Sequence, residues 1–112
     1  MLITLPWPAS PLWPNRRPHW AVFSRHARLA HRTAWAVTLE SKASGTELRF
    51  AFHPPRRPGL MNIDGCISAN KHHCDGIANA LGVDDSMLRI SWPEAFSEPV
   101  KGGAIVVEIG GD

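Results

Sequence analysis

The sequence predicts an α+β fold: a small mixed β-sheet with two main helices packed on it, in the order β-α-β-α-β-β. Short apolar or alternating segments are bounded by Pro and Gly, as strands usually are. Two longer segments have apolar residues at helical spacing. With 112 residues and 44% apolar residues, we expect one compact domain, residues 1–112, and not two.

Strands are expected in four short segments: residues 2–5, 46–53, 87–92 and 104–109. The second segment alternates polar and apolar residues through Leu48, Phe50 and Phe52, which is typical of a half-buried strand. Between the first strand and the first helix, residues 6–18 hold five of the ten prolines. This proline-rich segment is expected to be an extended loop.

Helices are expected over residues 19–43 and residues 63–81. The first segment contains neither Gly nor Pro, and we expect it to end before Gly45. The second segment has one apolar stripe and should end at Gly82. The positions that give the two segments their helical spacing are Trp20, Phe23, Ala27, Ala30, Ala34, Val37 and Leu39 in the first and Ile63, Ile67, Cys74, Ile77 and Leu81 in the second.

Charge is distributed unevenly, although the net charge is only +2. Residues 1–58 hold nine Lys or Arg and two Asp or Glu, whereas residues 59–112 hold three and eight. This asymmetry suggests a polyanion-binding surface beside a cation-binding site. A chance asymmetry in a short chain is the alternative at this point.

Neither a membrane span nor a signal peptide is expected. The chain contains no run of about 18 apolar residues. The N-terminal segment MLITLPWPAS has no basic region before its apolar residues. We therefore expect a cytoplasmic protein.

A candidate chemical site starts at Asp64. Asp64 and Lys71 are two helical turns apart and should project from nearly the same face, and Asp75 follows Lys71 by four residues. Asp84 and Asp85 come after Gly82 in a turn before a strand. If the chain folds back beside the helix start, Asp64 and one aspartate of this pair would converge. Such carboxylates suit Mg²⁺, and a neighbouring lysine suits the charge of a reacting phosphodiester.

Structural explanations compete with this site. Asp64 can be a carboxylate favoured by the dipole at a helix start. Lys71 and Asp75 can be a weak exposed pair, and the Asp pair can belong to an ordinary turn. A zinc site in CISANKHHC is disfavoured, because His72, His73 and Cys74 would fan over roughly 200° of a helix.

Several motifs together resemble a known family. They are ITLPWPAS, NRRP, NIDGCISANKHHCDGIANALGVDDS and EPVKGG, and the resemblance as a whole extends from residue 3 to about residue 109. They resemble the RusA family of Holliday-junction resolvases, which are crossover junction endodeoxyribonucleases, in its prophage-type branch. The segment from Lys71 to Asp85 carries the most specific part of the resemblance. The whole chain would then be a single RusA-like endonuclease domain.

The resemblance implies site residues position by position. Asp64, Lys71 and Asp85 match the catalytic residues, with Asp64 and Asp85 holding the metal and Asp84 assisting. Asn62 stands where the family has an aspartate and can still offer a neutral oxygen to the metal. Gly65 stands where the family has asparagine.

The resemblance also implies an activity and its partners. The implied activity is symmetric nicking of four-way DNA in recombination and repair. The implied partners are a second copy of the chain, which forms a homodimer, and Mg²⁺, or Mn²⁺ in its place. Phosphates would meet the basic N-terminal half, through Arg16, Arg17, Arg25, Arg28, Arg32, Arg56 and Arg57. The alternative is a relative, weakened or inactivated by Asn62, that binds branched DNA without cleaving it. An unrelated small domain with a structural helix cap is a third interpretation.

Overall fold

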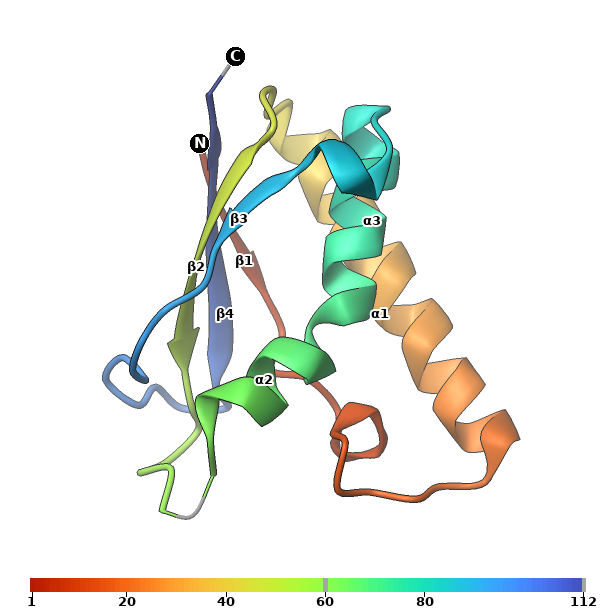
Figure 1. The fold of residues 1–112 in the computed structure, drawn as a ribbon, viewed down its shortest axis with the longest axis vertical. Coiled ribbons are helices and arrows are strands. Elements are labelled where there is room, and N and C mark those ends of the chain that lie inside the picture. The colour runs from red at the N-terminus through yellow and green to blue at the C-terminus, as the bar shows by residue number, and fades with distance from the viewer. Residues whose placement is uncertain (60, 112) are drawn as a thin grey trace.

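The predicted α+β fold is confirmed by the computed structural model, which describes residues 1–59 and 61–111. A mixed four-stranded sheet carries its helices on one face (Figure 1). The strands are β1 (Leu2–Leu5), β2 (Glu47–His53), β3 (Arg89–Ser91) and β4 (Ala104–Gly110), and the α-helices are α1 (Trp20–Ser41), α2 (Ile63–Ala69) and α3 (Lys71–Leu81). Two short 3-10 helices, η1 (Ser10–Leu12) and η2 (Asp85–Met87), lie in the connections.

The order of the strands places three of the connecting loops at one end of the sheet. The order is β1-β4-β2-β3, with β4 antiparallel to β1 and β2, and with β2 parallel to β3. Strands β1, β2 and β3 therefore run in the same direction. The loops that follow them, beginning at Pro6, Pro54 and Trp92, leave from the same edge (Figure 1).

The core lies between the sheet and the helices. Alternate residues of β2 are buried, and they face alternate buried residues of β4 across the register: Leu48 opposite Ile109, and Phe50 opposite Val107. Burial of each such side chain stabilises the fold by about 1.5–3 kcal/mol. The other sheet face carries the exposed residues Glu47, Arg49 and Glu108, which explains the polar and apolar alternation of the sequence.

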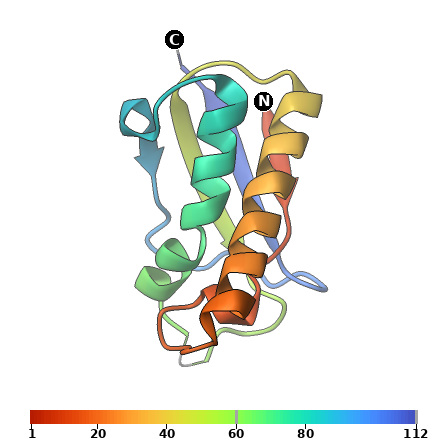
Figure 2. The same cartoon turned by 90° about the vertical axis from the view of Figure 1, so that its right-hand side faces the viewer.

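Helices α1 and α3 pack side by side over the sheet (Figure 2). α1 buries its small residues Ala30 and Ala34, whereas Trp20 and Leu39 are 75% and 46% exposed. α1 ends earlier than the sequence predicts, because Lys42 adopts a left-handed conformation with φ 58° and its N–H bonds to the Leu39 carbonyl. Across the described residues, no helix is both long and apolar enough to span a membrane.

The prediction of one helix over residues 63–81 is wrong, because the segment is divided at Asn70 into α2 and α3. Asn70 is buried, and its side-chain Nδ2 donates to the Cys66 carbonyl at 2.8 Å while its Oδ1 meets His73 Nδ1 at 2.8 Å. Asparagine offers the backbone such local alternatives to regular helical bonding. The break at Asn70 separates Asp64 from Lys71, which the continuous helix would have placed on one face.

Candidate active site

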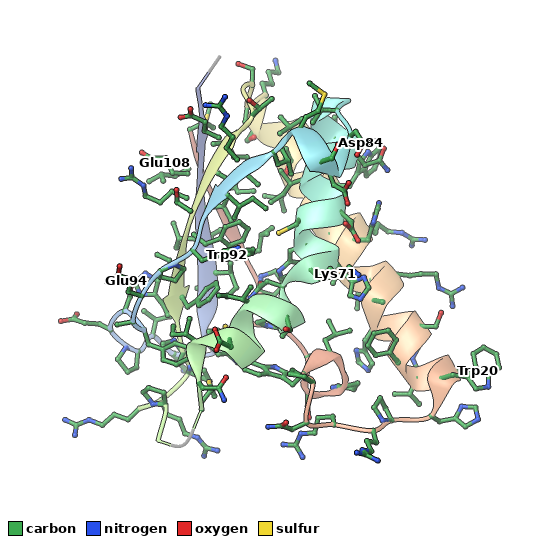
Figure 3. All side chains as sticks on the ribbon, viewed as in Figure 1. Trp20, Lys71, Asp84, Trp92, Glu94 and Glu108 are labelled. Atoms are coloured by element: carbon green, nitrogen blue, oxygen red, sulfur yellow. The ribbon has the colours of Figure 1, made fainter. Side chains whose placement is uncertain are left out.

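A cavity of about 320 Å³ between α3 and β3 brings together three of the candidate polar residues. Lys71, Asp75 and Asp85 line it, together with Ser68. Its remaining lining is apolar: Ile67, Cys74, Leu88, Ile90 and Trp92. Figure 3 shows Lys71 at the start of α3 and Trp92 in the space between that helix and the sheet. The cavity lining therefore combines three charged side chains with an apolar wall.

Lys71 is exposed and available to an anion. It begins α3, and it makes no salt bridge within residues 1–59 and 61–111. Asp75 lies one turn further along, but its Oδ2 contacts His72 Nδ1 at 4.0 Å instead of the Lys71 ammonium. The simple i, i+4 pair between Lys71 and Asp75, one of the structural alternatives, is therefore not formed at salt-bridge distance.

The two adjacent aspartates after Gly82 have different positions. Asp84 is the N-cap of η2, and its Oδ1 accepts from the backbone N–H of Ser86 at 3.0 Å. This hydrogen bond lowers the pKa of Asp84. Asp85 lines the cavity, and its pKa is raised by its hydrogen bond to Asp84 and by the negative charges of Asp84 and Asp75. Asp85 thus belongs to the site, whereas Asp84 acts on it from outside the cavity lining.

Asp64 and Asn62 line a neighbouring cavity of about 240 Å³. Asn62 is the N-cap of α2, and its Oδ1 accepts from the backbone N–H of Gly65 at 2.6 Å. Asp64 lies exposed in the first turn of α2, where the helix dipole favours a carboxylate. Ser68 lines both this cavity and the one around Lys71. Asp64 therefore lies in a cavity next to the one that Asp85 lines, and the two aspartates do not share a cavity.

A divalent cation suits the pair Asp75 and Asp85. Both line the same cavity, and the negative charge of Asp75 contributes, after the hydrogen bond and charge of Asp84, to raising the pKa of Asp85; a bound cation would offset these negative charges. Mg²⁺ commonly takes one or two protein carboxylates and completes its shell with water. In the part of the chain that the structure describes, no group of three or more His, Cys, Asp or Glu side chains is arranged to hold a metal. Asp75 was not among the metal ligands predicted from the sequence. The signal that could have found it was its position four residues after Lys71.

The two cysteines belong to the core. Cys66 and Cys74 are both buried and are not joined by a disulfide. Burial raises the pKa of each thiol to about 12. Both are therefore protonated near neutral pH, which is the form suited to packing.

His73 forms a buried polar network behind the site. It is 2% exposed, and because Asn70 Nδ2 already donates to Cys66, Asn70 Oδ1 accepts from His73 Nδ1. Burial lowers the pKa of His73 to about 4. Neutral His73 thus holds the break between α2 and α3, which positions Lys71.

All seven arginines predicted to meet phosphates are exposed. Arg25, Arg28 and Arg32 lie on α1, where Arg28 and Arg32 line a groove with His31 and His72. The other four lie in the loops at the carboxyl edge of the sheet: Arg16, Arg17, Arg56 and Arg57. Two basic surfaces are therefore open to a polyanion.

Comparison with known proteins shows which protein family the chain belongs to. No family model matches the chain. An uncharacterized protein of Xylella fastidiosa (strain Temecula1) is 33% identical over 117 aligned residues, which cover 97% of this chain and 75% of the relative. At this identity and coverage, the chain belongs to the same protein family as the Xylella fastidiosa protein.

Proposed function

We propose that the protein is a Mg²⁺-dependent endonuclease that nicks branched DNA, with four-way Holliday junctions as its substrate in recombination and repair. The observation that carries this proposal is the shared cavity of Lys71, Asp75 and Asp85. A lysine ammonium with no salt bridge among the described residues, beside two carboxylates in the same cavity, suits a phosphodiester and the cation that assists its hydrolysis. The motif resemblance to RusA-type resolvases supports the same activity.

The roles of the side chains follow from their positions. Asp75 and Asp85 would hold Mg²⁺, or Mn²⁺ in its place, and Asp64 would reach it from the adjoining cavity. The bound cation would supply an activated water and neutralise charge on the phosphate. Lys71 would donate to a non-bridging or leaving oxygen, where negative charge increases in the transition state. The apolar wall, including Trp92, would limit water around the reacting phosphate.

Substrate binding would use the exposed arginines and a second copy of the chain. Each phosphate that an arginine neutralises releases counterions, so affinity should fall steeply as salt increases. Two sites related by a two-fold axis would match the pseudo-symmetry of a four-way junction. We therefore propose a homodimer that acts in the cytoplasm.

A second candidate function is binding of branched DNA without cleavage. Asn62 favours it, because this residue provides no negative charge and its Oδ1 is engaged by Gly65 N–H at 2.6 Å. A site with fewer carboxylates binds a divalent cation more weakly. The two candidates share a substrate and differ in whether the phosphodiester is broken.

A cleavage assay on synthetic DNA separates these functions. The protein is incubated with an end-labelled four-way junction, and with the matching linear duplex, in Mg²⁺, in Mn²⁺ and in EDTA. A nuclease gives paired nicks on opposing strands of the junction, only with metal, and leaves the duplex intact. A bound but uncut junction at every metal concentration would support the binding function. Failure to bind the junction would contradict both.

A further inference from the structure

A further cavity, of about 430 Å³, lies at the carboxyl edge of the sheet, outside the cavity of Lys71 and Asp85. We call it the tryptophan pocket, and its principal lining residues are Trp7, Trp13, Arg16, Pro55, Arg56 and Met61. The proline-rich loop after β1 forms one side, and the loop after β2 forms the other. The proposed chemistry of strand cleavage does not require any of these side chains.

The two indole rings are held in place from behind. Trp7 and Trp13 lie with their ring centroids 5.8 Å apart, and both are half-buried. Trp13 Nε1 donates to the Pro8 carbonyl at 3.2 Å. Trp7 packs so closely on Gly103 that a Cβ there would lie 2.8 Å from the Trp7 Cβ. Rings fixed in this way lose little freedom on binding and suit a stacking platform.

The charged side chains of the tryptophan pocket are arginines, which favour an anionic ligand. Arg16 and Arg56 line it and are exposed, and the neighbours Arg17 and Arg57 are exposed as well. None of the described residues that line the pocket is acidic, and Asn15 and Ser10 add hydrogen-bonding groups. Aromatic faces beside arginines suit a ligand with a planar ring and a phosphate, which is the chemistry of an unpaired nucleotide.

The pocket adjoins the candidate active site. Trp13, Asn15 and Met61 line both the tryptophan pocket and the cavity that holds Asp64. Ser68 in turn joins the Asp64 cavity to the cavity of Lys71 and Asp85. A strand whose phosphate lies at Lys71 thus has a course along α2 toward the two tryptophans.

We infer that the tryptophan pocket binds an unpaired nucleotide of single-stranded DNA, its base on the indole rings of Trp7 and Trp13 and its phosphate at Arg16 and Arg56. The choice of DNA as the ligand rests on the proposed function. The stacking and the charge rest on the pocket itself. Only a base released from pairing, as when a strand opens at the branch point, would be free to enter such a pocket.

The test measures binding without metal, so it is independent of cleavage. Fluorescence anisotropy in EDTA compares three labelled ligands: a short oligothymidine, an abasic strand of equal length, and a duplex of equal length. The wild-type chain should bind oligothymidine roughly tenfold more tightly than the abasic strand, since stacking on aromatic rings requires bases. It should also prefer the single strand to the duplex.

Variants then assign the binding to the pocket. Trp7→Leu should remove most of the preference for bases over abasic sites. Arg56→Ala should weaken binding to both single strands and reduce the slope of log affinity against log salt by about one. Arg49→Ala is the matched control, because Arg49 is an exposed arginine on the sheet face that the helices do not cover. This variant should leave the base preference unchanged. The wild-type comparison stands even if Trp7→Leu fails to fold.

Two results would overturn the inference: equal affinity for the oligothymidine and the abasic strand, or tighter binding of the duplex than of the oligothymidine. Failure of the proposed function is a separate outcome. A chain that binds single strands as expected but leaves junctions uncut with metal would refute the nuclease and retain the pocket. A chain that cuts junctions but shows no preference for bases over abasic sites would support the nuclease and refute the inference about the tryptophan pocket.

Discussion

Gly76 of α3 lies directly against the backbone of His31 on α1. A Cβ at Gly76 would collide with the His31 carbonyl oxygen and would lie 3.0 Å from the Ala34 Cβ. The two helices are therefore as close as a residue without a side chain allows. Because α3 begins at Lys71 and also carries Asp75, this contact fixes the helix that presents the candidate active site.

Gly76→Ala should therefore destabilise the protein. Overpacking against backbone usually costs about 1–3 kcal/mol, and this should exceed the gain of up to about 1 kcal/mol in helix propensity. Urea unfolding measures the difference. Gly65→Ala in α2 is the control, because its Cβ would meet only side chains, at 3.0 Å or more, and it should change stability by less than Gly76→Ala. Equal effects would show that the α1–α3 contact is not unusually close.

His73 should make stability depend on pH. Burial lowers its pKa from 6.5 to about 4, so between these values the unfolded chain binds a proton that the folded chain does not. The stabilisation is fully present above pH 6.5 and is lost as pH falls toward 4. The loss should be about 3 kcal/mol at most.

Urea unfolding at pH 7.5 and pH 4.5 measures this loss. His73→Asn is the matched variant, because its amide can donate to Asn70 Oδ1 and does not titrate. The variant should lose less stability than the wild type over the same pH interval. The same pH dependence in both proteins would exclude His73 as its source.

The fold class and the positions of the strands and the first helix could largely be predicted from sequence, because alternation and helical spacing are local properties. The break at Asn70 could not, since it depends on a buried network with Cys66 and His73. The arrangement of the candidate residues could be predicted only in part. Lys71 and Asp85 line one cavity as expected, but Asp64 lines its neighbour. Which carboxylates share a cavity depends on how α3 packs against β3, and residue spacing does not contain that information.

Asn62 offers a test of how the missing carboxylate affects the site. Asn62→Asp keeps an N-cap acceptor for Gly65 N–H and adds a negative charge beside Asp64. We expect similar stability, faster nicking, and a lower Mg²⁺ concentration for half-maximal activity. Asn62→Ala should instead lose about 1 kcal/mol of stability through the lost cap. An unchanged metal requirement in Asn62→Asp would exclude a role for this position in cation binding.

The proposed homodimer has a direct test. Light scattering after size exclusion at micromolar concentration should give twice the mass of the chain. A chain of 112 residues buries a modest share of its surface alone, so association adds burial. A monomer mass over the whole concentration range would contradict symmetric nicking by two fixed sites.

The most direct test of the central proposal compares two adjacent aspartates. Asp85 lines the cavity with Lys71 and Asp75, whereas Asp84 caps η2 outside the lining. Asn keeps the shape of either residue, and Asn can also cap a helix. Asp84→Asn and Asp85→Asn therefore remove the same charge from neighbouring positions.

The measurement is the single-turnover rate of junction nicking with saturating Mg²⁺, for the wild type, these two variants and Lys71→Ala. The proposed site predicts that Asp85→Asn and Lys71→Ala lose about 10²–10³-fold in rate, which is typical for removal of one preorganised electrostatic group. Asp84→Asn should lose less than about tenfold, since it acts outside the lining. Equal losses in Asp84→Asn and Asp85→Asn, or a Lys71→Ala variant that nicks at the wild-type rate, would contradict it.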